Sequence, residues 1–237
     1  MVLRGRKKVN HHLEQMAQAI FKSWFVDFEP FDGEQPTTWI TGKAEDFFDI
    51  AIGKTPPRKE PEWFTTNPHD VIWVSISDMG SCGMFISDSS EYLTAESIER
   101  FNVKVVPRGT VLLSFKLTVG RVVIADGTMT TNEAIAHFKQ STKETLEYLY
   151  CYLKAFDYQS LGNTSSIATA VNSKTIKAMQ FVMPDNETLV EFHAATAPLF
   201  ELVRVNLAEN NRLASLRDTL LPCLMSGELS VADLHTK

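Results

Sequence analysis

The chain has 237 residues, of which 44% are hydrophobic, and this is enough for one domain or two small ones with ordinary cores. No uninterrupted apolar run approaches the roughly 18 residues of a membrane-spanning helix, which argues against an integral membrane protein. The formal net charge of −6 argues against a free-standing nucleic-acid binder, because such proteins carry a basic field.

The N-terminal region is basic and leads into an amphipathic helix instead of a short apolar core with a cleavage site, so we predict no signal peptide. Apolar residues recurring at spacings of three and four predict a helix over residues 10–26, roughly 25 Å long, that ends before Pro30. Its abrupt beginning indicates the end of a longer helix. The stripe consists of Leu13, Met16, Ala17, Ile20, Phe21, Trp24 and Phe25. Trp24, Phe25 and Phe28 could stack on bases, but at helical spacing we expect them in the core.

Strand signals dominate from Thr38 to about Val182. Short β-branched or aromatic runs alternate with turn signals, and the period changes to a helical one over residues 142–156. The predicted strands begin at Val71, Val103, Val111 and Arg121, and a shorter helix over residues 171–178 precedes a last strand that ends at Pro184. This pattern predicts a β-rich domain with a few helices packed on it.

The last predicted helix runs from about Asn186 to Leu221, roughly 50 Å, and Pro222 with Gly227 is expected to end it. Pro198 predicts a kink or a helix start near Ala197. A heptad places Leu199, Asn206, Leu213 and Leu220 at one core position and Leu202, Glu209, Leu216 and Cys223 at the other. Two helices with an apolar seam, one at each end, are typical of segments that pair.

Several phrases together resemble the specificity subunits of type I restriction–modification systems. Residues 16–30 and 209–229 are similar to the ends of that family's conserved helices. Between them, elements of one target recognition domain begin at Gly53, Trp73, Pro107, Val119, Thr131 and Leu161. The resemblance covers nearly the whole chain from His12, but it includes one recognition domain where family members typically carry two.

The resemblance implies an α+β fold, in which a β-rich target recognition domain with packed helices is flanked by long helices that form an antiparallel coiled coil. We expect three parts, residues 1–30, 31–186 and 187–237. The implied partners are double-stranded DNA, methyltransferase (modification) subunits and a restriction–translocation subunit. S-adenosylmethionine and ATP would belong to those partners, with no cofactor in this chain. Two loops depart from the family's pattern, with Lys54 in place of glycine and Ser114-Phe-Lys-Leu-Thr in place of a Ser-Arg-Gly-Thr turn.

Three polar loops suit contact with DNA. Cations and hydroxyls can bind phosphates, while Lys, Arg and Asn side chains can pair with base edges. The candidates are Lys54, Thr55, Arg58 and Lys59 in the first loop; Lys116, Thr118 and Arg121 in the second; and Asn163, Thr164 and Ser165, with Lys174 downstream, in the third. The alternatives are a solvated loop partly neutralised by Glu60 and Glu62, an ordinary hairpin turn, and a loop that leads to a helix N-cap near Asn172 or Ser173.

Ser75, Ser77 and Asp78 follow a predicted strand, and Asp78 could accept a hydrogen bond from cytosine. The alternative is that Asp78 caps a turn. His11 and His12 face different sides of a helix, so we expect surface residues and not a metal site.

No catalytic motif is found: the chain lacks a phosphate-cradling glycine motif, a His/Cys metal cluster and an adenine methyltransferase signature. Three distant cysteines, Cys82, Cys151 and Cys223, predict neither disulfides nor a zinc site and fit a reducing cytoplasm. We therefore predict a non-catalytic, cytoplasmic specificity subunit that binds one half of a bipartite DNA target.

With one recognition domain per chain, we expect a homodimer through the flanking helices. The residues expected in this coiled coil are Leu13, Ile20, Trp24, Leu199, Leu202, Asn206, Leu213, Leu216 and Leu220. A rival hypothesis is an interaction module that binds no DNA and sequesters partner subunits. It is favoured by the acidic balance of residues 37–187, which hold 14 Lys and Arg against 18 Asp and Glu.

Overall fold

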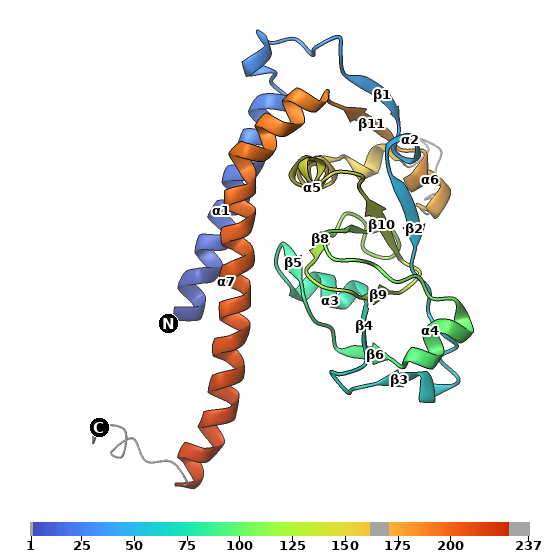
Figure 1. Ribbon diagram of the computed structural model, residues 1–237, viewed down its shortest axis with the longest axis vertical. Helices are drawn as coiled ribbons and strands as arrows, with labels where there is room; N and C mark the ends of the chain where they lie inside the picture. The colour runs from blue at the N-terminus through green and yellow to red at the C-terminus, as the bar shows by residue number, and fades with distance from the viewer. Residues whose placement is uncertain (1, 162–170, 228–237) are drawn as a thin grey trace.

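A computed structural model describes residues 2–161 and 171–227, without the side chains of residues 2–6. Two long helices, α1 (Val2–Phe25) and α7 (Asn186–Ser226), lie side by side and run in opposite directions beside an α+β domain (Figure 1). Helix α5 (Leu146–Ala155) lies between this pair and the sheets.

The domain contains three small sheets. The central sheet has the order β2-β10-β7-β8-β5, with strands Asp49–Ile52, Ile135–Lys139, Val111–Ser114, Val122–Ala125 and Phe85–Ile86. The second has the order β3-β6-β4-β9, with strands Phe64–Thr65, Glu91–Leu93, Val71–Val74 and Thr130–Thr131. The third pairs β1 (Ile40–Lys43) with β11 (Gln180–Met183). Most neighbours are antiparallel, whereas β4 with β9 and β5 with β8 are parallel.

Short helices connect these strands. They are α2 (Ala44–Phe47), α3 (Ile76–Ser81), α4 (Ala95–Phe101) and α6 (Ser173–Lys177), with 3-10 turns at Glu29–Phe31, Pro61–Trp63, Lys143–Thr145 and Tyr158–Leu161. The strands of the central sheet are short and largely buried because their β-branched and apolar side chains pack on both faces. The predicted β-rich domain with packed helices is confirmed in outline.

An aromatic cluster joins the two long helices to the domain. Phe192 of α7 is fully buried, and its ring centroid lies 5.0 Å from Phe25 and 5.8 Å from Trp24, both of α1. Tyr148 of α5 completes the cluster at 4.7 Å from Phe25, and its hydroxyl donates to the carbonyl of Val182 in β11. The expectation that Trp24 and Phe25 belong to the core is therefore confirmed.

The helix bounds differ from the sequence prediction in three ways. Helix α1 begins at Val2 and not at Asn10, and α7 continues through Pro222 to Ser226. Pro198 neither starts nor interrupts α7. Both prolines are exposed, so the carbonyl oxygens that lose an N–H donor face water and the helix tolerates the loss.

One predicted strand is also wrong. The run from Val103 to Val106 forms no strand but a single bridge between Val106 and Met129, because Val103 instead packs beside Trp73 and Leu93 after α4. The other three predicted strands of the series correspond to β4, β7 and β8.

The predicted heptad seam is only partly buried. In the first half of α7, Phe200 and Val203 face the core, whereas Leu202 is 46% exposed. On the α1 side, Leu13, Ile20 and Trp24 pack against the same core, so this stripe is used within the chain. A further seam residue, Leu199, packs there too.

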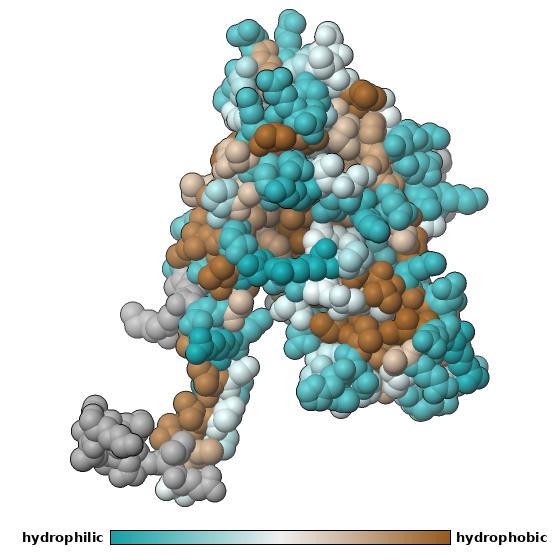
Figure 2. Space-filling model, viewed as in Figure 1, coloured by the Kyte–Doolittle hydropathy of each residue, from teal (hydrophilic) through white to brown (hydrophobic). Residues whose placement is uncertain are grey.

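The second half of α7 extends beyond α1. Asn206 donates to Asn10 at 2.9 Å, and the eight residues from Asn10 back to Val2 cover only about 12 Å. Leu216 and Leu220 remain 46% and 44% exposed, and hydrophobic surface follows this part of the helix (Figure 2). In residues 2–161 and 171–227, no helix is long and apolar enough to cross a membrane.

Replacing Phe192 by alanine is expected to lower the free energy of unfolding by about 3–5 kcal/mol, because the cavity would open where three helices meet. The matched control is Val190→Ala on the exposed side of the same helix, expected to change it by less than about 0.5 kcal/mol. Urea denaturation followed by circular dichroism measures both. Equal effects of the two variants would show that Phe192 does not join the helices to the domain.

Candidate nucleic-acid interface

The first predicted loop leaves β2 and lies across the segment after β9. The amide of Gly53 donates to Ile135 at 3.1 Å, and that of Lys54 donates to Thr131 at 2.9 Å. A Cβ atom on Gly53 would lie 2.1 Å from both the carbonyl oxygen of Asn132 and Oγ1 of Thr131. Only glycine permits this close approach, so the loop is fixed at its base.

A buried polar contact supports that base. Oγ1 of Thr131 lies 2.7 Å from Nε2 of His137 in β10. Burial lowers the pKa of His137 to about 4, so its imidazole is neutral near pH 7. The histidine therefore acts as an uncharged hydrogen-bonding partner beneath the loop and not as a cation that faces a ligand.

Arg58 is exposed, but contacts within the domain fix its orientation. Its guanidinium donates two hydrogen bonds of 2.8 Å to the carboxylate of Glu91 and lies 4.0 Å from the ring centroid of Phe64 and 4.6 Å from that of Trp73. The hydrogen bond from Arg58 lowers the pKa of Glu91 and keeps it ionised. This bidentate, stacked geometry shapes the loop, although the Arg58 side chain remains 49% exposed.

The other residues of the loop differ in availability. Nζ of Lys54 donates to the carbonyl of Phe101, and Oγ1 of Thr55 donates to Glu133. Lys59 is exposed, and its side chain has no ion pair or hydrogen bond within the described residues.

The second predicted loop is the tip of the β7–β8 hairpin, and it is closed by one serine. Oγ of Ser114 donates to the carbonyl of Thr118 at 2.5 Å and accepts from the amide of Arg121 at 3.1 Å. Nη1 of Arg121 donates to the carbonyl of Ile76 at 2.6 Å, so this guanidinium anchors the hairpin on α3. Lys116 and Thr118 are exposed at the tip.

Glu133 interacts with both the first loop and the hairpin tip. Its carboxylate accepts from Thr55, and its pKa is lowered, although burial opposes this, by that hydrogen bond and by the charges of Lys116 and Arg58. The structure thus brings together residues separated by more than 60 positions in the sequence, and it places Glu133, which the sequence analysis did not select, between them.

Asp78 has the structural role of a cap. Burial opposes ionisation, but hydrogen bonds from Ser75 and Ser90 lower its pKa, and Ser75 with Asp78 forms a capping box at the start of α3. This is the alternative that the sequence left open. Ser77 is exposed on α3.

The third predicted loop lies largely outside the described residues, including Asn163, Thr164 and Ser165. Lys174 is exposed in the first turn of α6, and Oδ1 of Asn172 accepts from the amides of Lys174 and Thr175 at 2.9 and 3.1 Å. Asn172 is therefore the N-cap of α6, as in the alternative that the sequence left open.

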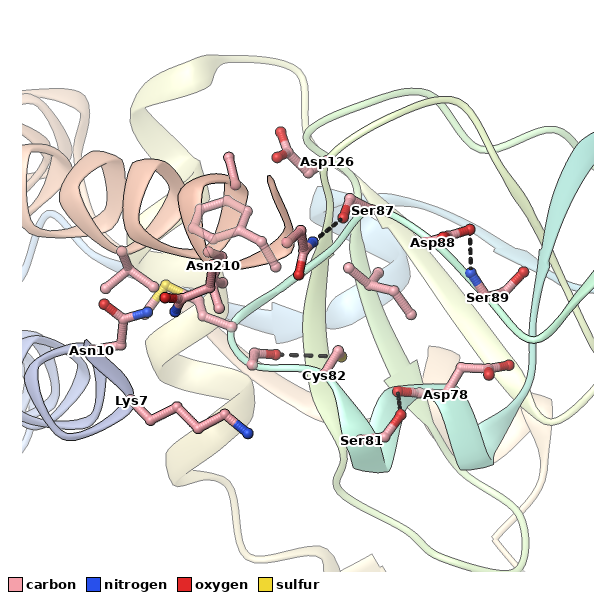
Figure 3. Close-up of a pocket in the computed structure, with 18 of the residues that line it drawn as sticks. Lys7, Asn10, Asp78, Ser81, Cys82, Ser87, Asp88, Ser89, Asp126 and Asn210 are labelled. Carbon is pink, nitrogen blue, oxygen red and sulfur yellow. Dashed lines mark hydrogen bonds between the residues drawn. The ribbon is translucent and has the colours of Figure 1, made fainter. Parts of the chain in front are cut away.

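A separate cavity of about 710 Å³ lies where the helix pair meets the domain (Figure 3). Asn10 of α1, Asn210 of α7 and Cys82 after α3 border it. Burial raises the pKa of Cys82 to about 11, so its thiol is protonated. In the described part of the chain, no group of three or more His, Cys, Asp or Glu side chains could hold a metal ion.

Gly53→Ala is expected to lower the free energy of unfolding by about 1–3 kcal/mol, because backbone atoms must move to admit the Cβ atom. Gly127→Ala is the matched control, since nothing lies within 4 Å of its Cβ position and its φ is not positive. Urea denaturation compares the two variants. Equal stability of both would contradict the close approach at Gly53.

Comparisons with known proteins agree with this fold. The family model of the type I restriction modification DNA specificity domain matches residues 36–191. The chain is 25% identical to the HindI specificity subunit of Haemophilus influenzae, over 94% of this chain and 63% of that protein. It is 26% identical to the MjaIX specificity subunit of Methanocaldococcus jannaschii, over 98% and 56% respectively.

Two solved structures share the fold. The S subunit of a type I restriction-modification system from M. genitalium has a TM-score of 0.60 at 14% identity and is matched over 92% of this chain and 55% of its own. The HsdS subunit from Thermoanaerobacter tengcongensis has a TM-score of 0.55 at 18% identity, over 96% and 54%. This chain thus spans about half to two-thirds of the proteins it matches.

Specificity subunits are non-catalytic, so the prediction that this chain carries no catalytic centre follows from its family. The family model covers well over half of the sequence, from just before β1 into the start of α7. With the long helices on each side of one α+β domain, the chain belongs to the family of type I restriction–modification specificity subunits.

Proposed function

We propose that this chain binds one half of a bipartite DNA target and positions methyltransferase and restriction subunits on it. The observation that carries this proposal is that Glu133 interacts with both the first loop and the hairpin tip, through the hydrogen bond from Thr55 and the charge of Lys116. Lys59, Lys116 and Thr118 are exposed in these two loops, on backbone that hydrogen bonds hold in place. A rigid pair of polar loops suits the reading of a duplex, because little ordering is needed on binding.

In this proposal the exposed lysines contact phosphates and Thr118 faces a base edge. Arg58 and Arg121 hold the loops in shape, since both guanidinium groups are engaged within the domain. The net charge of −6 implies that partner subunits supply much of the positive field. Methyl transfer with S-adenosylmethionine and ATP-driven translocation would be the work of those partners.

Selection of a motif from a random duplex pool, with and without methyltransferase subunits and over a series of salt concentrations, tests this proposal. Lys59→Ala and Lys116→Ala are each expected to weaken binding and to reduce the slope of log K against log salt concentration by about 1, because each removes a phosphate contact. Lys143→Ala is the control, since this exposed lysine precedes α5, far along the chain from both loops.

Enrichment of no motif under either condition would contradict DNA reading. It would favour the rival hypothesis of an interaction module that sequesters partner subunits, which the acidic balance supports. Pull-down of methyltransferase subunits in the same samples separates that rival from an inactive preparation.

We also propose a homodimer in which the second halves of two α7 helices join an antiparallel coiled coil. Support comes from the apolar side chains that α7 leaves exposed beyond α1, among them Leu216, Leu220 and Leu224. Two copies related by a two-fold axis would present two recognition domains to a palindromic, interrupted site. Since Leu13, Ile20 and Trp24 are used within the chain, the contact between copies would depend on α7.

The double substitution Leu216→Glu and Leu220→Glu is expected to convert the dimer into a monomer, because it places charges in the apolar seam. Val190→Glu, at an equally exposed apolar position in the first half of α7, is expected to leave the dimer intact. Light scattering at micromolar concentration measures the mass. A monomeric unsubstituted chain, or a dimer that survives the double substitution, would contradict the proposal.

A further inference from the structure

The tip of the β7–β8 hairpin carries an apolar residue that is exposed and has an unusual backbone conformation. The side chain of Leu117 is 97% exposed, more than any other large hydrophobic residue in the described part of the chain. Its φ is +59°, in the left-handed region. This conformation is strained for a residue with a Cβ atom, and glycine would adopt it without that cost.

The tip keeps this strained conformation because several hydrogen bonds and packing contacts hold its backbone in place. Ser114 bonds to both Thr118 and Arg121, and the amide of Gly120 donates to the carbonyl of Ser114 at 3.0 Å. Gly120, with φ +88°, lies against the ring of Tyr158, which a Cβ atom would approach to 3.0 Å. A rigid loop that presents an exposed leucine in a strained conformation is typical of a recognition site.

The shape of this element indicates which groove it enters. The tip is a loop of residues 115–121 between two buried strands of the five-stranded sheet, and it is two backbone segments wide, as a two-stranded ribbon is. An element of that width fits the major groove of B-DNA, about 12 Å wide, but not the minor groove, about 6 Å wide. In the major groove, the apolar feature that base pairs present is the 5-methyl group of thymine. Leucine has no hydrogen-bonding group, so in this groove its apolar side chain is suited to contact with that methyl group.

We propose that Leu117 is a specificity-determining residue that packs against a thymine methyl group in the major groove. The inference rests on the proposed DNA reading and adds a residue that the sequence analysis did not select. Its neighbours are suited to complementary roles, since Lys116 and Thr118 are exposed on either side and can bind phosphate or a polar base edge. Because the tip is rigid, the leucine is already in position before DNA binds.

The test begins with the motif selected by the full chain, together with methyltransferase subunits where binding requires them. Each thymine in the site is then replaced by deoxyuridine, which lacks only the 5-methyl group. We expect one position at which the replacement weakens binding about fourfold, the effect of losing one buried methyl group. Leu117→Ala should bind the thymine and deoxyuridine duplexes equally.

Val119→Ala is the matched control, because Val119 is a second apolar residue of the same tip, 36% exposed, and should retain the fourfold discrimination. Leu117→Gly removes the strain and should also lose discrimination while remaining folded. If replacing no thymine of the wild-type motif weakens binding, the inference is overturned and the proposed function stands. The same holds if Leu117→Ala loses as much affinity on the replacement as the wild-type chain does.

A wedge role is a different outcome. If 2-aminopurine fluorescence shows that wild-type binding unstacks a base step and Leu117→Ala does not, insertion replaces the methyl contact and the inference is wrong. If the wild-type chain enriches no motif at all, the proposed function fails, and this inference fails with it.

Discussion

The packing of aromatic rings around Phe192 determines how the two long helices lie against the domain. Rings from α1, α5 and α7 meet there, and Tyr148 extends the cluster to β11. Helix α5 in turn contacts strands β7 and β8, which end in the hairpin tip. Because such interiors are densely packed and resist deformation, the cluster connects the orientation of the long helices to the position of the hairpin tip.

The charges near the two loops are largely used by the protein itself. Arg58 pairs with Glu91, Arg121 bonds to Ile76, and Lys54 bonds to Phe101. These cations organise loop backbone, which explains how a domain with more acidic than basic residues can still present a few basic side chains in fixed places. Shape and a small number of exposed groups, together with partner subunits, would then determine which duplex is bound.

The sequence predicted the long helices and three of the four strands that it placed before the central helix, because apolar periodicity reports burial directly. It did not predict that α7 passes through Pro222, since that depends on the exposed side of the helix. It also selected Arg58 and Arg121 as DNA contacts from their charge alone. Their partners, Glu91 and Ile76, lie 33 and 45 positions away, and only the pairing of the strands brings them together. The close approach at Gly53 and the positive φ of Leu117 also depend on backbone conformation, which sequence patterns do not report.

The hydrogen bond between Asn10 and Asn206 has a consequence for how the two long helices align. Asn10 is only 8% exposed, so its amide is nearly out of reach of solvent. Sliding one helix past the other by a single turn, about 5.4 Å, would separate the two amides, and Oδ1 of Asn10 would lose its donor. Leucine contacts alone would tolerate several such offsets. The amide pair therefore favours one alignment of the two helices. This alignment determines how far the second half of α7 extends beyond α1.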